Sequence, residues 1–287
     1  MTKPYIDTLE GAPEHLLINK ESAFSVFGII YRQLELWVKI VDNYGAVKCI
    51  DKTKEPTTVE YMDLFHDLVL FGYTKSCKSL LASRILIENI YQEDAQIILR
   101  SVYETYLSLN YVYRNPNTIE HFTKKSIGVS AGLLQHPTNK HGKKIKNQII
   151  NPDTNEVEAF GISIATLVSA LPKNSEIKAH DIIYPYLCEH THFNMISSGN
   201  YREPDHKKYT YINYHSYDQP IIIQEYIMLI FLDLIVNDIK LDSTELTDEI
   251  RLLNQIGKTE LINHMNLMNL EDADKIFRQA LIDRLKE

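Results

Sequence analysis

Apolar side chains recur at steps of three and four residues along almost the whole of this 287-residue chain. That spacing places them on one side of a helix, whereas a half-buried strand would show strict alternation. The longest runs cover residues 16–41, 57–88 and 93–114, and no strand patterns alternate with them. The pattern predicts an all-α protein, a bundle of about eight helices in a single domain over residues 1–287, and it disfavours a doubly wound α/β fold.

The middle of the chain interrupts this pattern. Residues 136–155 are polar and turn-rich and contain four lysines. They have few large apolar side chains to bury, so we expect a mobile loop there. Helical spacing resumes at 157–171. A further helix starts near Asn174, and Pro185 either kinks it or, as we prefer, opens a new helix over 186–199, since proline suits a first turn.

Three segments complete the chain. Residues 200–216 partly alternate tyrosine with polar residues, which is compatible with a small β-hairpin. Residues 220–239 are strongly apolar and are predicted to form a central helix. Residues 240–287 have amphipathic spacing with mixed charges and are predicted to form a C-terminal helical extension.

Composition argues against several classes of protein. The net charge of −8 disfavours sequence-blind binding to nucleic acid, and three cysteines suit a reducing cytoplasm better than a disulfide scaffold. The first 19 residues lack an apolar core with basic flanks, which argues against a secretory signal. The apolar stretch 221–236 includes Gln224, Glu225 and Asp233, so it is too polar to span a bilayer. We therefore expect a cytoplasmic protein with no membrane partner.

One candidate site lies on the predicted helix 93–114. Arg100, Glu104 and Tyr111 share a face of this helix, because they lie four and seven residues apart. The other faces are rich in Leu, Val and Tyr, so we expect Arg100 and Glu104 to be buried and paired, since an unpaired charge in a core is costly. The alternative is a solvated helix face with one surface salt bridge.

A second candidate site follows Pro185. Tyr184, Cys188 and His192 lie one turn apart in succession, so one helix edge presents a phenol, a thiol and an imidazole. Asn194 follows two residues later. Glu189 and His192 have the spacing of a carboxylate-bridged di-iron site, but such a site needs a second helical Glu-x-x-His. We therefore predict no metal and no cofactor.

The stretch from Ala82 to Pro116 resembles a bacterial family of uncharacterised all-helical proteins. Its members pair an Arg-Ser-x-x-Glu-like helix with a later helix reading Tyr-x-x-Leu-Ser-x-x-x-His-x-Ser. The resemblance covers roughly residues 60–235, a family-like core. The matching positions are Arg100 and Glu104 in the first motif and Tyr184, Leu187, Cys188 (in place of Ser), His192 and Asn194 in the second.

This resemblance carries expectations about function. The architecture and the Arg/His pairing are similar to those of HEPN-type ribonucleases and of phage-defence proteins, which implies a role in bacterial defence or a toxin-like action. The short HEPN pattern, an Arg followed by a His after four to six positions, is also matched by Arg114 and His121.

Two hypotheses about function remain open. In the preferred one, the residues form a buried Arg-Glu-His network that fixes helix register, and the protein acts through a protein partner or as a homo-oligomer. In the alternative, the protein is a metal-independent ribonuclease: His192 is acid and base, Arg100 stabilises the phosphate, Glu104 orients Arg100, and Tyr111 and Tyr184 lie nearby. RNA is a partner only in the alternative. A cleft open to solvent favours the enzyme, and a sealed network favours the first hypothesis.

Overall fold

The computed structural model describes residues 19–47, 64–89, 91–191, 201–202, 208–209, 218–239, 244–268 and 272–287. Within them the chain forms nine α-helices and one two-stranded antiparallel sheet, which confirms the predicted all-α bundle. The described sheet lies within residues 148–159, outside the stretch 200–216 in which a hairpin was predicted. The helices are α2 (Lys20–Val47), α3 (Leu64–Glu88), α4 (Gln92–Arg114), α5 (Ile119–Ser130), α6 (Ile164–Val168), α7 (Asn174–Thr191), α8 (Asp218–Asp233), α9 (Thr244–Leu267) and α10 (Asp272–Lys286). The strands are β1 (Gln148–Ile150) and β2 (Val157–Ala159).

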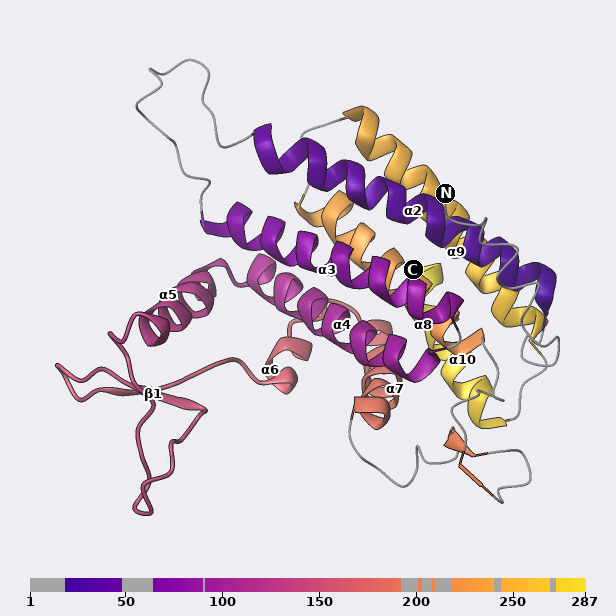
Figure 1. Ribbon diagram of the computed structural model, residues 1–287. Coiled ribbons are helices and arrows are strands. Elements are labelled where there is room, and N and C mark those ends of the chain that lie inside the picture. Colours follow the sequence, from indigo (N-terminus) through magenta and orange to yellow (C-terminus); the bar gives the residue numbers. More distant parts are fainter. Residues whose placement is uncertain are drawn as a thin grey trace.

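Helix α8 is the centre of the bundle. It contacts α2, α3, α4 and α9, and in Figure 1 it is seen between the long helices α2 and α3. The segment Asp218–Asn237 is long and apolar enough to cross a membrane, but 89% of its most apolar window is buried inside the protein. Core packing therefore accounts for the apolar character of this helix. A π-helical turn (Leu234–Ile239) extends it.

Aromatic contacts hold α2 and α3 against the central helix α8. The ring of Trp37 on α2 stacks on Tyr73 of α3, with centroids 4.2 Å apart, and meets Phe231 of α8 edge-on at 5.0 Å. All three side chains are almost fully buried. Contacts of this kind contribute beyond the apolar area they bury, so they define how α2 and α3 lie on α8.

A buried polar contact lies where α2, α8 and α9 meet. The Gln33 amide nitrogen donates to Glu225 Oε1 at 2.9 Å, and both residues are fully buried. The backbone of α9 approaches closely at Gly257, where a Cβ would lie 2.5 Å from Glu225 Oε1 and 2.9 Å from Leu229 Cδ2. The missing side chain at Gly257 leaves the room that the Glu225 carboxyl occupies.

We expect Gly257→Ala to lower the free energy of unfolding by about 1–2 kcal/mol, because overpacking here exceeds the gain in helix propensity. Gly28 on α2 is the matched control, since a Cβ there meets nothing within 4 Å. Gly28→Ala should instead raise stability by about 0.5–1 kcal/mol. Urea unfolding followed by circular dichroism measures both, and equal shifts in the same direction would contradict the close packing at Gly257.

An arm, residues 131–163, projects from the helical body between α5 and α6 (Figure 1). Its sheet pairs Gln148 with Ala159 and Ile150 with Val157, and Gln135 bridges to Ile150 on the other side. The loop predicted at 136–155 thus contains a strand, and the helix predicted at 157–171 is wrong over its first residues. Backbone pairing and burial of Ile149 outweigh the helical spacing there. The mobility of 136–155 stays a prediction.

The tyrosine-rich stretch 200–216 is described only at residues 201–202 and 208–209. Arg202 and Tyr209 form an isolated antiparallel bridge there, and the Arg202 guanidinium donates to the Tyr209 hydroxyl at 3.0 Å. The rest of the predicted hairpin lies outside the described residues.

Candidate functional site

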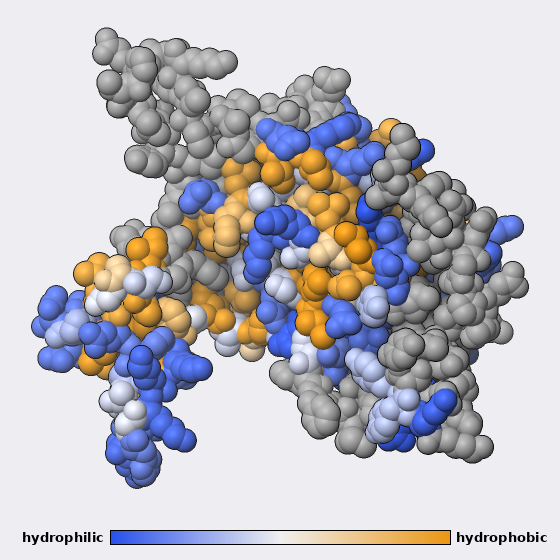
Figure 2. Space-filling model, viewed as in Figure 1, coloured by the Kyte–Doolittle hydropathy of each residue, from blue (hydrophilic) through white to orange (hydrophobic). Residues whose placement is uncertain are grey.

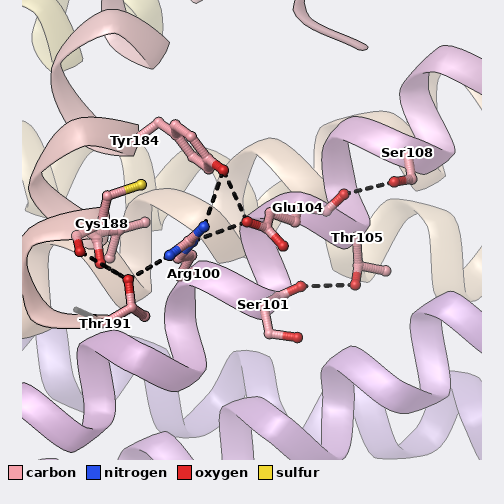
Figure 3. A network of polar contacts seen from close by, with 9 residues as sticks. Arg100, Ser101, Glu104, Thr105, Ser108, Tyr184, Cys188 and Thr191 are labelled. Carbon is pink, nitrogen blue, oxygen red and sulfur yellow. Dashed lines mark hydrogen bonds and ion pairs between the residues drawn. The ribbon is translucent and has the colours of Figure 1, made fainter. Parts of the chain in front are cut away.

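Arg100 on α4 is the centre of a polar cluster that joins α4 to α7 (Figure 3). Its Nε donates to Glu104 Oε1 at 2.9 Å, one turn along the same helix. Its two terminal nitrogens donate to the hydroxyls of Thr191 and Tyr184, both on α7. The Tyr184 hydroxyl in turn donates to Glu104 Oε1 at 3.0 Å. The guanidinium is therefore held in one orientation by groups from two helices.

Helix α7 is continuous through Pro185, so the preferred prediction of a new helix beginning at that residue is wrong. Proline removes one backbone hydrogen bond, but its ring lies on the exposed side of the helix. On the other side Ala179, Ile183 and Leu187 are fully buried at steps of four, before and after the proline. Packing of this unbroken stripe outweighs the lost hydrogen bond and keeps Tyr184 and Thr191 on one edge of one helix.

A series of stacked rings packs against the cluster. The Arg100 guanidinium lies over the Tyr184 ring at 5.4 Å, Tyr184 stacks on His180 at 5.1 Å, and His180 stacks on Tyr103 of α4 at 5.8 Å. The Tyr103 hydroxyl lies 3.2 Å from His180 Nδ1. Because every member touches the next, the position of the guanidinium is tied to the packing of α4 on α7.

Burial and charge set the protonation of these groups. Burial works to lower the pKa of Arg100, but its hydrogen bonds to Tyr184 and Glu104 outweigh burial and raise the pKa, so the guanidinium stays charged. Burial raises the pKa of Tyr184 and lowers that of His180. A neutral phenol, a neutral imidazole and a fixed cation therefore lie side by side at neutral pH.

The cluster is not sealed. Arg100 and Glu104 are paired as expected, but their side chains are 21% and 36% exposed, so the expectation that both are substantially buried needs correction. Glu104 is exposed because it lies on the wall of an open groove of about 270 Å³ between α3 and α4. On α3 it is lined by Phe71, Gly72 and Lys75, among others.

The two sides of this groove differ in chemistry. Ser101, Thr105 and Ser108 of α4 present hydroxyls, and those of Thr105 and Ser108 donate to backbone carbonyls at 2.8 Å, which leaves their lone pairs available as acceptors. Opposite them, Phe71 is 65% exposed, and Lys75 is exposed and forms no ion pair with any residue that the structure describes. The groove thus combines an apolar ring, a cation, a carboxylate and hydroxyls.

The helices approach closely along this groove because α3 has a glycine at the contact. A Cβ at Gly72 would lie 3.0 Å from the Leu109 side chain, which is tighter than ordinary van der Waals contact. Gly72 therefore allows α3 to approach α4 closely at the groove.

The structure brings some of the predicted site residues together and leaves others apart. Arg100, Glu104 and Tyr184 come together, and Cys188 lies on the same edge of α7, where its carbonyl accepts from the Thr191 hydroxyl at 2.8 Å (Figure 3). Tyr111 does not join them: it lies about two turns beyond Glu104 and packs partly buried against the core. The remaining two predicted residues, His192 and Asn194, lie outside the described residues.

Two parts of the site were missed by sequence reasoning. Thr191 lies seven residues after Tyr184, on the same helix edge, so helical spacing could have found it. Lys75 and Phe71 had no such signal, because they belong to the site only through the packing of α3 on α4. Arg114 of the short HEPN-like pattern donates to Asn110 Oδ1 at 3.0 Å, and the side chain of His121 is outside the described residues.

This is a helical-bundle protein whose candidate site lies in the groove and polar cluster shared by α3, α4 and α7. Residues 66–209, half of the chain, match a family of unknown function, DUF5677, and the chain belongs to this family. The match covers every residue of the cluster and the groove described above. No curated protein and no solved structure matches the chain.

Proposed function

We propose that the groove between α3 and α4 binds a nucleotide unit of single-stranded RNA, and that the protein cleaves RNA without a metal ion. The observation that carries this proposal is the opening of the Arg100 cluster onto the groove, through Glu104. A network that only fixed helix register would gain most from being sealed, because water weakens each of its contacts.

The chemistry of the groove suits a nucleotide. The exposed ring of Phe71 offers a stacking surface for a base, and every base has a face that stacks on an aromatic ring. Lys75 offers a cation for a phosphate, and the α4 hydroxyls can bind a ribose.

The proposed reaction uses the 2′-hydroxyl of the RNA itself. A base removes its proton, O2′ attacks phosphorus, the bond from phosphorus to O5′ breaks, and an acid protonates O5′, which leaves a 2′,3′-cyclic phosphate. Arg100 stabilises the charge that develops on the phosphate. Glu104, Tyr184 and Thr191 hold Arg100 in place. His192, the residue after Thr191, exchanges the protons.

A second candidate function, binding of a protein partner or of a second copy, is favoured by one observation. Apolar side chains are exposed on the same face of the bundle, where Figure 2 shows apolar surface on both sides of a polar strip. Phe71 and Ile85 on α3 and Ile97 on α4 are 65%, 52% and 41% exposed. Light scattering over a range of concentrations tests self-association. A role in bacterial defence or as a toxin is compatible with either function and rests on analogy.

The test is cleavage of a fluorescent single-stranded RNA by the purified protein in EDTA. We expect products with 2′,3′-cyclic phosphate ends, no cleavage of the all-deoxy strand, and a loss of about 10²-fold or more in Arg100→Gln and in His192→Ala. Arg32→Gln, at an exposed arginine of α2, is the matched control and should cleave like the wild type. Intact RNA with the wild-type protein, or equal cleavage by all variants, would show the proposal to be wrong.

The loss of activity expected in Arg100→Gln should not be caused by unfolding of the variant. Because Arg100 and Glu104 are partly exposed, Arg100→Gln should lower the free energy of unfolding by only about 1 kcal/mol. The variant should therefore remain folded under the conditions of the cleavage assay, and circular dichroism can verify this.

A further inference from the structure

Positive charge is concentrated in one part of this acidic chain. Between residues 121 and 152 there are six lysines and no Asp or Glu, although the whole chain has a net charge of −8. Four of these lysines lie close together in the arm: Lys140, Lys143, Lys144 and Lys146. All four are exposed, and none of them forms an ion pair with a residue that the structure describes. Their charge is therefore available to a ligand.

Three of these lysines lie in or next to a tight turn at residues 138–144. The Asn139 side-chain oxygen accepts from the backbone N–H groups of His141 and Lys143, at 2.9 and 3.0 Å, and Gly142 adopts a φ of 73°, which favours glycine. The Asn139 N–H donates to the Lys143 carbonyl at 2.8 Å, and Thr138 bridges to Lys144. Polar backbone groups of the turn are thus hydrogen-bonded within the turn itself, and the lysine side chains are exposed.

The base of the arm is anchored to α5. Lys125 of α5 pairs with Glu158 of β2 at 2.7 Å and donates to the Ala159 carbonyl at 3.1 Å. The chain enters the arm from the end of α4, through α5, and returns through α6, which packs against α4. Helix α4 also forms one wall of the groove, so the arm and the groove share a support.

We propose that Lys140, Lys143, Lys144 and Lys146 form a binding site for the phosphate backbone of single-stranded RNA, separate from the groove. This inference rests on the proposed function for the choice of RNA, and it adds the surface that draws an extended strand to an otherwise acidic protein. A membrane fits less well, because the tip has no exposed apolar side chain to insert: Ile145, its one large apolar residue, is partly buried. Figure 2 shows hydrophilic residues over the tips of the arm.

The test measures binding of a fluorescent 30-nucleotide 2′-O-methyl RNA by anisotropy over a series of salt concentrations. This strand has no free 2′-hydroxyl, so the result does not depend on cleavage. The test variant is the triple substitution Lys140→Gln, Lys143→Gln and Lys144→Gln. The matched control substitutes three exposed lysines of α2, α7 and α10 by Gln: Lys39, Lys178 and Lys286.

We expect the arm variant to bind roughly tenfold to a hundredfold more weakly than the wild type near 0.15 M salt, and the slope of log K against log salt to fall by about 2. The control variant should bind like the wild type. Equal affinities and slopes for the arm and control variants would overturn the proposal, and so would lysine-dependent binding to vesicles containing phosphatidylserine together with no binding to RNA. Failure of the proposed function gives a different result, intact RNA in the cleavage assay while arm-dependent binding persists.

Discussion

Replacing Arg284 with alanine is expected to lower the free energy of unfolding by about 3–5 kcal/mol. Arg284 on α10 lies 2.7 Å from Glu176 on α7, and their side chains are only 8% and 7% exposed. Burial raises the pKa of Glu176, and Arg284 opposes that rise. Removal of the arginine would leave a carboxylate in the core without its partner, between the C-terminal helix and the helix that supports the candidate site.

A double variant separates the loss of the pair from the loss of one partner. Glu176→Leu combined with Arg284→Met fills a similar volume with apolar groups, and such replacements are often neutral or stabilising. The double variant should therefore recover most of the stability that Arg284→Ala loses. Urea unfolding of the wild type and both variants at pH 7 measures this. A loss below about 1 kcal/mol in Arg284→Ala would show that water reaches the pair and that α10 is not packed as described.

Replacing Glu225 with glutamine is expected to make the protein more stable at high pH, by roughly 4 kcal/mol at pH 8. Burial raises the pKa of Glu225 to about 8, against an ordinary value of 4.5, and the hydrogen bond from Gln33 offsets this only in part. Because the folded state holds this proton more tightly, Glu225 favours folding most below pH 4.5. Its contribution is lost as the pH rises from 4.5 to about 8.

Glutamine keeps the shape and removes the titration. The stability difference between Glu225→Gln and the wild type should therefore be small near pH 5 and grow steadily up to pH 8. Glu35→Gln is the matched control, since it removes an exposed carboxyl on the same helix as Gln33. A difference that stays constant between pH 5 and pH 8 would contradict a neutral, buried Glu225.

Much of the fold could be predicted from the spacing of apolar residues, because in a helical bundle that spacing directly records which face is buried. The prediction failed where another force outweighs local pattern. Pro185 lies inside a helix because the buried stripe continues on both sides of it. Residues 157–159 form a strand because a partner strand supplies hydrogen bonds that the segment alone does not reveal.

The candidate site was predictable to the extent that it is local. Arg100 and Glu104 pair at the distance that their i, i+4 spacing suggests, and Tyr184 approaches them from the predicted helix edge. The groove was not predictable, because it depends on how closely α3 approaches α4 at Gly72. Glu225 was not predictable either: in the sequence it is one of three polar residues that interrupt an apolar stretch, whereas in the fold it is a buried acid next to Gly257.

The most direct test of the central claim, that the groove beside the Arg100 cluster is the ligand site, is a crystal structure of the protein with a dinucleotide that lacks the attacking 2′-hydroxyl. We predict that a base lies against Phe71, that the phosphate lies within reach of Lys75 and Arg100, and that Glu104 still pairs with Arg100. A dinucleotide bound at another surface, with the groove empty at concentrations that saturate the protein in solution, would contradict the claim.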